Sequence, residues 1–178
     1  MFHLLISTLM KDNTVLTPHF KLREFTESAT AMKYGIDNQP TPEVVENLRR
    51  LCTHTLEPLR EKLGLPIVIT SGFRTKELND IIVHASRKSQ HMSGQAADFH
   101  VAQGQVQGSR VQGSRELLIQ AFRLIIEDES IDFDQLIIYP TFIHVSYVSQ
   151  ERNRHQITKA NGNGTYCALS RAQALALV

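Results

Sequence analysis

The segment Ser89-Gln-His-Met-Ser-Gly-Gln-Ala-Ala-Asp98 brings an imidazole, a glycine and a carboxylate close together in the chain. The polar residues before Gly94 favour a loop, whereas the residues from Ala96 to Val101 have the apolar content of a strand. Small residues at positions 94 and 96 leave room for the backbone to fold back on itself. We therefore expect His91, in the loop, and Asp98, on the strand, to meet at one point.

A third polar residue, His144, lies in the apolar segment from Phe142 to Tyr147. In a strand, residues 142, 144 and 146 share one face, and a buried polar side chain there needs a partner. Two imidazoles and one carboxylate are a typical donor set for catalytic zinc, with water in the fourth position. Because the chain has 8 histidines, such a set could be chosen in many ways, and residue type alone is weak evidence for a zinc site. The alternative is that His91 and His144 are only hydrogen-bonded.

Short helices and strands are predicted around these residues, without a regular alternation of strand and helix. The clearest helix spans residues 42–63, with Thr41 as N-cap, an apolar stripe at three- and four-residue steps, and a break at Pro58. Other helices are predicted at 77–83, after Ser114 and after Ser170; strands at 66–70, 96–101, 133–139 and 142–148. Residues 14–40 are expected to be an irregular entry segment, and the pattern as a whole indicates an α+β fold.

Composition limits the classes of protein that fit. The chain has 178 residues, a formal net charge of +1, 42% hydrophobic and 21% charged residues, so we expect one domain over residues 1–178. No basic block supports nucleic-acid binding, and no apolar run is long enough for a membrane span. The two cysteines, Cys52 and Cys167, are not spaced for a cysteine-based zinc or redox site.

Two segments are expected to lie outside the regular fold. Residues 1–13 are expected to be a poorly ordered N-terminal segment, and residues 104–113, which contain a short repeat, are expected to be an exposed loop.

The pattern Ser89-x-His91-x-x-Gly94-x-Ala96-x-Asp98 resembles the signature of the zinc D-Ala-D-Ala carboxypeptidase-like peptidases (peptidase family M15, subfamily A). Upstream, residues 69–74 (Ile-Thr-Ser-Gly-Phe-Arg) are similar to that family's strand ending in Ser-Gly-Tyr-Arg. Downstream, residues 142–146 are similar to its final Trp-x-His strand, with Phe in place of Trp. The resemblance covers roughly residues 17–150. It implies a hedgehog/DD-peptidase-like α+β fold, with a small, mostly antiparallel sheet and flanking helices.

The resemblance also implies roles for individual residues. His91, Asp98 and His144 would bind zinc. Arg74 would face the cleft and hold a substrate carboxylate or the developing oxyanion, as a fixed guanidinium suits both; the alternative is a surface ion pair. Ser89 would hydrogen-bond the substrate or orient the loop; the alternative is an ordinary loop-stabilising hydroxyl.

The general base departs from the family pattern. Many relatives place a carboxylate three residues before the last histidine, where this chain has Thr141, and others place Glu where it has Tyr139. Tyrosine is a poor base at neutral pH, although it donates hydrogen bonds. Strand alternation puts Asp134 and Tyr139 on opposite faces unless a bulge intervenes. His100 shares the face of Asp98, so it is a candidate acid, base or spare ligand, or a residue of the surrounding shell.

The sequence thus predicts a zinc metallopeptidase that hydrolyses peptidoglycan stem peptides, as a D-Ala-D-Ala carboxypeptidase-like enzyme or a related endopeptidase. The missing carboxylate motivates an alternative, a non-catalytic zinc-containing module that binds cell-wall peptide or protein. A structural α+β domain without metal is a third hypothesis. The expected partner is a peptidoglycan peptide; the oligomeric state stays open. The first ten residues lack a basic region and a cleavage site, which favours a cytoplasmic or phage-associated location.

Overall fold

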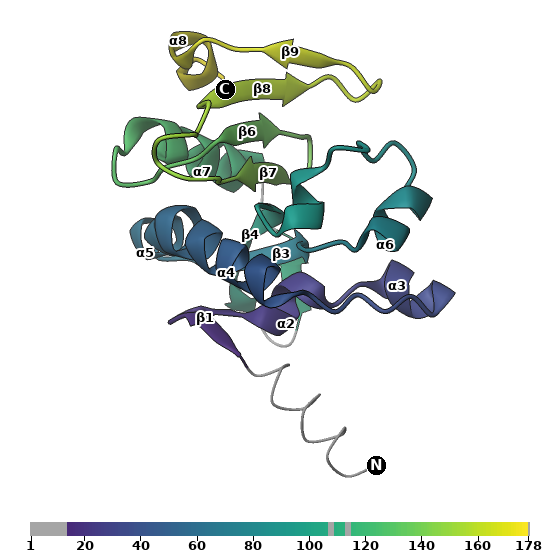
Figure 1. Cartoon of the computed structure of the whole chain (residues 1–178). Helices are drawn as coiled ribbons and strands as arrows, with labels where there is room; N and C mark the ends of the chain where they lie inside the picture. Colours follow the sequence, from purple (N-terminus) through teal and green to yellow (C-terminus); the bar gives the residue numbers. More distant parts are fainter. Residues whose placement is uncertain (1–13, 107–108, 113–114, 178) are drawn as a thin grey trace.

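The structure, a computed structural model, describes residues 14–106, 109–112 and 115–177 (Figure 1). Its strands are β1 (Val15–Thr17), β2 (Phe20–Lys21), β3 (Ile67–Ser71), β4 (Ala96–Val106), β5 (Ser109–Gln112), β6 (Gln135–Ile138), β7 (Ile143–Ser146), β8 (Gln156–Ala160) and β9 (Tyr166–Ala168). Its helices are α2 (Leu22–Thr26), α3 (Ala29–Tyr34), α4 (Pro42–Leu51), the π-helical η1 (Cys52–Leu56), α5 (Glu57–Leu63), α6 (Lys76–Ile81), the 3₁₀ turn η2 (Gln90–Ser93), α7 (Arg115–Glu127) and α8 (Arg171–Leu175). None of these helices combines the length and apolarity needed to cross a membrane.

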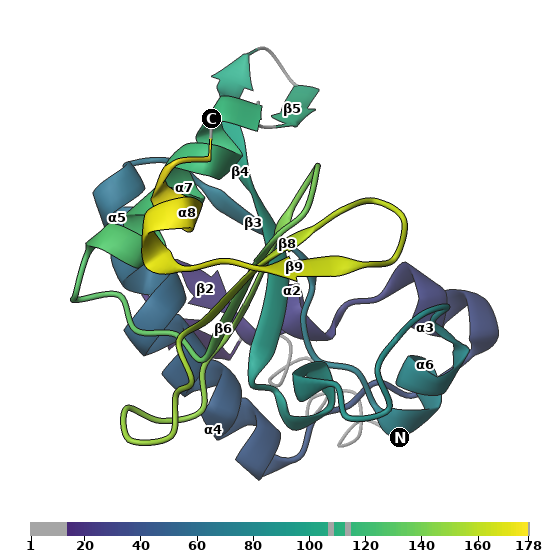
Figure 2. The same ribbon diagram turned by 90° about the horizontal axis from the view of Figure 1, so that it is seen from above.

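The main sheet has the strand order β3-β4-β7-β6-β8-β9, which Figure 1 shows stacked from bottom to top. Neighbouring strands are antiparallel except β6 and β8, which are parallel. The predicted α+β fold with a small, mostly antiparallel sheet and flanking helices is confirmed. Figure 2 shows α5, α7 and α8 on one side of this sheet, with α3 and α6 on the other.

Alternation along the strands divides the sheet into an apolar face and a polar face. Phe99 and Val101 of β4 and Val145 of β7 are buried in one hydrophobic core cluster with helical residues such as Leu48 and Phe122. The intervening strand residues therefore point to the opposite face. That second face, toward α6, carries the side chains of the candidate site.

The long predicted helix forms with the expected cap and the expected break. Thr41 accepts a hydrogen bond from the backbone N–H of Val44, and Gly64 ends the helix in the left-handed conformation at φ 62°. The π-helical turn η1 precedes Pro58, whose missing N–H and ring disfavour a regular bond to the carbonyl of His54. That carbonyl instead accepts the N–H of Asp132 at 3.0 Å. The break thus ties the helix to the segment that leads into β6.

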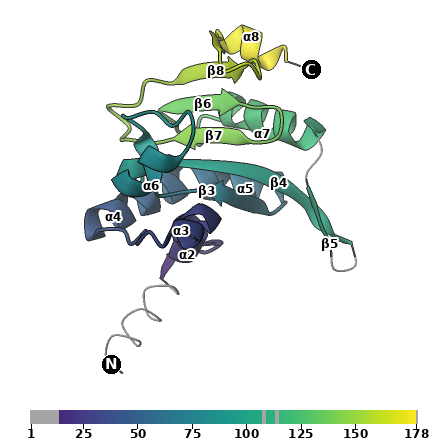
Figure 3. The same cartoon turned by 90° about the vertical axis from the view of Figure 1, so that its right-hand side faces the viewer.

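Two segments differ from the sequence-based expectations. Residues 104–113, expected as an exposed loop, include the end of β4 and all of β5, which pair in an antiparallel hairpin with Gln103 opposite Val111. Backbone pairing with the extended β4 explains the difference, and Figure 3 shows the hairpin projecting from the body. Strands β8 and β9 were not predicted, although the turn between them falls at the Asn161–Gly164 cluster. The expectations for residues 1–13 and for a cap at Ser114 lie outside the described residues.

Candidate metal centre and active-site cavity

The structure brings His91, Asp98 and His144 together from three separate segments. Asp98 of β4 lies directly opposite His144 of β7, so both side chains point to the same face. The turn η2 places His91 above them. His144 Nδ1 lies 2.8 Å from Asp98 Oδ1, and His91 Nε2 lies 3.4 Å from that oxygen and 3.3 Å from His144 Nδ1. One ligand atom from each residue lies within 4.8 Å of the others, close enough to share one metal ion.

Two glycines allow His91 to reach this position. Gly94 ends η2 at φ 68°, and a Cβ there would lie 2.6 Å from the carbonyl oxygen of Val44. Gly72 follows β3, and its carbonyl accepts a hydrogen bond from His91 Nδ1 at 2.7 Å. Because Nδ1 carries this proton, Nε2 is left with a lone pair that faces Asp98 and His144. The backbone geometry therefore explains why the 89–98 motif has glycine at position 94 and the 69–74 motif has glycine at position 72.

Replacing Gly72 with alanine should destabilise the fold and move His91. A Cβ on Gly72 would lie 2.5 Å from both the Cα and the carbonyl oxygen of Phe25, which is backbone that cannot rotate away. We expect the free energy of unfolding to fall by about 1–3 kcal/mol, the usual cost of overpacking. Urea denaturation measures this, with Gly162→Ala, a turn position with open space but positive φ, as a comparison. An unchanged midpoint for Gly72→Ala would contradict the packing described.

The electrostatics of the three residues suit a divalent cation. Burial lowers the pKa of His91, which favours the neutral imidazole that a metal requires. Burial on its own would raise the pKa of Asp98, but the adjacent imidazoles of His91 and His144 outweigh it and hold that pKa far below its usual value. An ionised carboxylate beside a neutral imidazole is the protonation state in which such a set binds metal. The residues present therefore fit a metal ion.

Arg74 lies at the edge of this group and is held by two partners. Its guanidinium donates to Ser71 Oγ at 2.8 Å and to Asp98 Oδ2 at 3.2 Å, and its side chain is only 13% exposed. Its backbone N–H also donates to the carbonyl of His91 at 3.2 Å. Arg74 is thus not a surface ion pair but a fixed cation beside the candidate metal ligands.

A cavity of about 970 Å³ opens from the three residues across the polar face of the sheet. Its volume is at the upper end of the range for ligand sites. Ser89 and Tyr139, both predicted as site residues, line it together with Arg74. His100 does not line it and lies farther along β4, opposite Val68 of β3.

Tyr139 lies on the cavity wall with its ring stacked on Phe142, at 4.1 Å between centroids. Its hydroxyl lies 3.1 Å from that of Tyr166, a residue of β9 that was not predicted to belong to the site. Burial and this hydrogen bond raise the pKa of Tyr139, and the negative charge of Asp98 adds to the effect. Tyr139 therefore keeps its proton at neutral pH, and in that state its hydroxyl is able to donate a hydrogen bond.

Asp134 lines the same cavity as Tyr139, so the expectation that the two lie on opposite faces is wrong. Asp134 precedes the first residue of β6, where strand alternation does not apply. It is 1% exposed and fully engaged. Its oxygens accept hydrogen bonds from the backbone and guanidinium of Arg154 and, at 2.8 Å, from the Gln90 side chain. Gln90 lies inside the Ser89–Asp98 motif, so the sequence offered a signal for it, whereas no sequence pattern identified Arg154.

Asp134 should make folding stability depend on pH at the acid end. Burial would raise its pKa, but the hydrogen bonds from Arg154 and Gln90 prevail and lower the pKa to about 2. An unfolded Asp has a pKa of about 3.9. Because the folded-state pKa is the lower one, the contribution is fully present above about pH 4 and is lost as pH falls through 2. Urea midpoints of wild type and Asp134→Asn should therefore converge on acidification; parallel curves would contradict this assignment.

Comparison with known protein families gives a match over most of the chain. The family model described as Peptidase M15 matches residues 18–125, which include Arg74, His91 and Asp98 and end before Tyr139 and His144. A search of curated proteins finds no match.

Proposed function

Because the chain belongs to the peptidase M15 family, we propose that it is a zinc metallopeptidase that hydrolyses peptidoglycan stem peptides. The observation that carries this proposal is the convergence of His91, Asp98 and His144 on one point at the end of a large cavity. Two imidazoles and a carboxylate are the donor set of an open catalytic zinc site. We further propose that residues 1–178 form one domain of the hedgehog/DD-peptidase type, since a single core cluster joins the described helices and the sheet.

In this proposal each residue of the centre has a defined task. His91, Asp98 and His144 would hold the metal. When bound, zinc supplies a nucleophile from water at neutral pH and polarises the carbonyl that is attacked. The guanidinium of Arg74, fixed by Ser71 and Asp98, stabilises negative charge on the carbonyl oxygen in the transition state.

Two further residues position the substrate in this proposal. Tyr139 donates its hydroxyl proton in a hydrogen bond, because burial keeps it protonated. Ser89 lines the cavity immediately before η2, where its hydroxyl is available to a peptide group. His100, which lies outside the cavity lining, is left with at most an indirect role in shaping β4 near Asp98.

The function is tested by incubating the zinc-loaded protein with purified muropeptides and identifying products by mass spectrometry. A carboxypeptidase releases free D-Ala, whereas an endopeptidase gives two shortened peptides. We expect one of these products from wild type and none from Asp98→Ala. The matched control is Asp37→Ala, an acidic residue outside both the cavity and the metal group. Absence of product from wild type with zinc bound would refute the enzymatic function.

A second candidate function is a non-catalytic zinc-containing module that binds cell-wall peptide or protein. One observation favours it: Asp98 and Asp134 are the carboxylates that line the cavity among the described residues, and both are engaged, by Arg74 and Arg154 respectively. Neither is therefore free to take a proton from water. A muropeptide binding isotherm without any product in the same samples would support the binding module over the peptidase.

A further inference from the structure

The cavity extends well beyond the candidate metal centre, along one row of residues on the sheet. Asp98 pairs with His144, His144 with Ile137, and Ile137 with Thr158 of β8. Paired residues point to the same face, and adjacent strands lie about 4.8 Å apart. Thr158 therefore lies two strands beyond His144, at a distance of about 10 Å.

Thr158 is a buried polar residue without a partner. It lines the cavity, is 6% exposed, and its hydroxyl makes no hydrogen bond within the part of the chain that the structure describes. A buried hydroxyl without a partner costs free energy, and such groups in native proteins are usually satisfied by water or a ligand. Thr158 thus marks a place where the cavity can bind a polar group.

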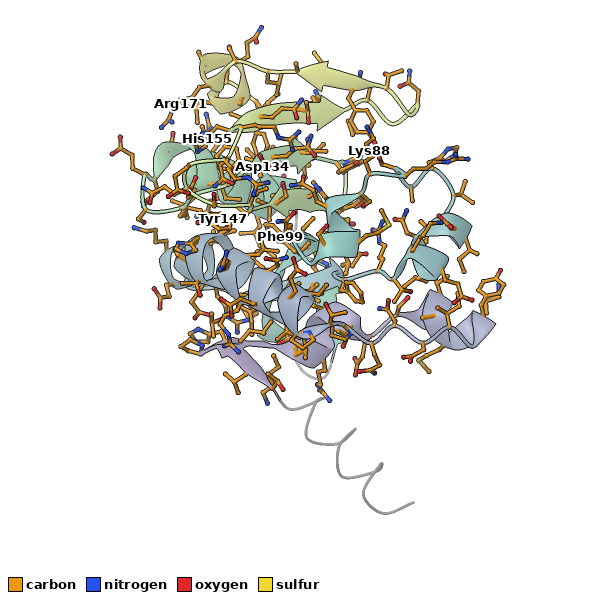
Figure 4. The ribbon with its side chains drawn as sticks, viewed as in Figure 1. Lys88, Phe99, Asp134, Tyr147, His155 and Arg171 are labelled. Atoms are coloured by element: carbon orange, nitrogen blue, oxygen red, sulfur yellow. The ribbon has the colours of Figure 1, made fainter. Side chains whose placement is uncertain are left out.

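The lining of the same cavity carries positive charge that is not neutralised. Four cationic side chains line the cavity, Arg74, Lys88, Arg152 and Arg154. Arg74 and Arg154 are paired with Asp98 and Asp134. Lys88, on the segment between α6 and η2 (Figure 4), and Arg152, in the turn before β8, have no ion pair with any described residue. The cavity therefore has an excess of two positive charges at its rim.

From these observations we infer that Thr158, Lys88 and Arg152 form a subsite for a carboxylate of the substrate, separate from the metal centre. The inference rests on the proposed peptidase function and names its substrate class, an acidic peptide. An extended peptide advances about 3.3–3.6 Å per residue, so about 10 Å corresponds to roughly three residues. The recognised carboxylate therefore belongs to a residue other than the two that flank the cleaved bond, and a free dipeptide is too short to reach it.

The test compares two probes that differ only in internal charge. One is a stem pentapeptide with its internal carboxyl groups free, and the other is the same peptide with those groups converted to carboxamides. Calorimetry on the full chain in the presence of a chelator measures affinity without turnover. Since charged hydrogen bonds are worth about 1.5–3 kcal/mol, we expect wild type to prefer the free carboxylates by about tenfold or more.

The variants locate the preference in the subsite. For the double variant Lys88→Gln, Arg152→Gln, the affinities for the two probes should differ by no more than about twofold. Thr158→Val should weaken the preference for the free carboxylates several-fold. Lys159→Gln is the matched control, because Lys159 is the next residue of β8, points to the other face, and does not line the cavity. Equal or absent binding of both probes to wild type, or an unchanged preference in the double variant, would overturn the subsite. If wild type prefers the peptide with free carboxylates but does not hydrolyse it after zinc is added, only the peptidase function is refuted.

Discussion

Replacing His144 with alanine should reduce peptide hydrolysis by more than about 1,000-fold and zinc affinity by more than about 100-fold. Losing a residue that only orients a metal ligand costs 10–100-fold in affinity, and His144 would be a ligand itself. Its Nδ1 lies within 3.3 Å of both Asp98 and His91, so no neighbouring side chain substitutes for it without a rearrangement. Steady-state rates on muropeptides and competition with a chromophoric chelator measure the two effects.

The matched control for this prediction is His54→Ala. His54 is exposed and stacks on Tyr147 at 4.7 Å between centroids, away from the cavity. Its replacement removes an imidazole of equal size without touching the metal centre. Circular dichroism of both variants establishes that they fold. If His144→Ala kept the rate and zinc affinity of His54→Ala, the assignment of His144 as a ligand would be wrong.

Replacing Arg74 with alanine should lower kcat/KM by about 100- to 1,000-fold at saturating zinc, the usual effect of removing a donor to an oxyanion. The guanidinium is held by Ser71 and Asp98 and is only 13% exposed, so its charge is positioned before substrate binds. Arg74→Lys keeps the charge but loses the planar fork, and we expect an intermediate rate. Saturating zinc matters because Arg74 also contacts Asp98, a proposed metal ligand.

The control for Arg74 is Arg87→Ala, which removes the same charge from an exposed position outside the cavity lining. Its kcat/KM should stay within about twofold of wild type, as expected for a surface substitution away from the site. A loss in Arg74→Ala no larger than in Arg87→Ala would show that Arg74 is structural only.

Much of the fold follows from local signals in the sequence. Thr41, Pro42 and Gly64 set the ends of the long helix because capping and backbone conformation depend on neighbouring residues. The break before Pro58 was predictable for the same reason. Strand β8 was not, because its defining interaction is a parallel pairing with β6 that the sequence does not encode locally.

The candidate site divides in the same way. His91, Asp98 and His144 were predictable because the segments that contain them resemble motifs of a known peptidase family, whereas residue type and strand pattern alone were a weak signal. Arg154, Thr158 and Tyr166 were not predictable, since only the pairing of β8 and β9 with the sheet brings them to the cavity. Tertiary structure, rather than any motif, therefore determines how the cavity extends beyond the metal centre.

The central claim is that His91, Asp98 and His144 together bind one zinc ion, and X-ray absorption of the zinc-loaded protein tests it most directly. We predict one zinc per chain, with two imidazole nitrogens and a carboxylate oxygen among its ligands, and loss of one imidazole signal in His91→Ala. A protein that binds no zinc, or a zinc environment without imidazole that His91→Ala leaves unchanged, would contradict the account.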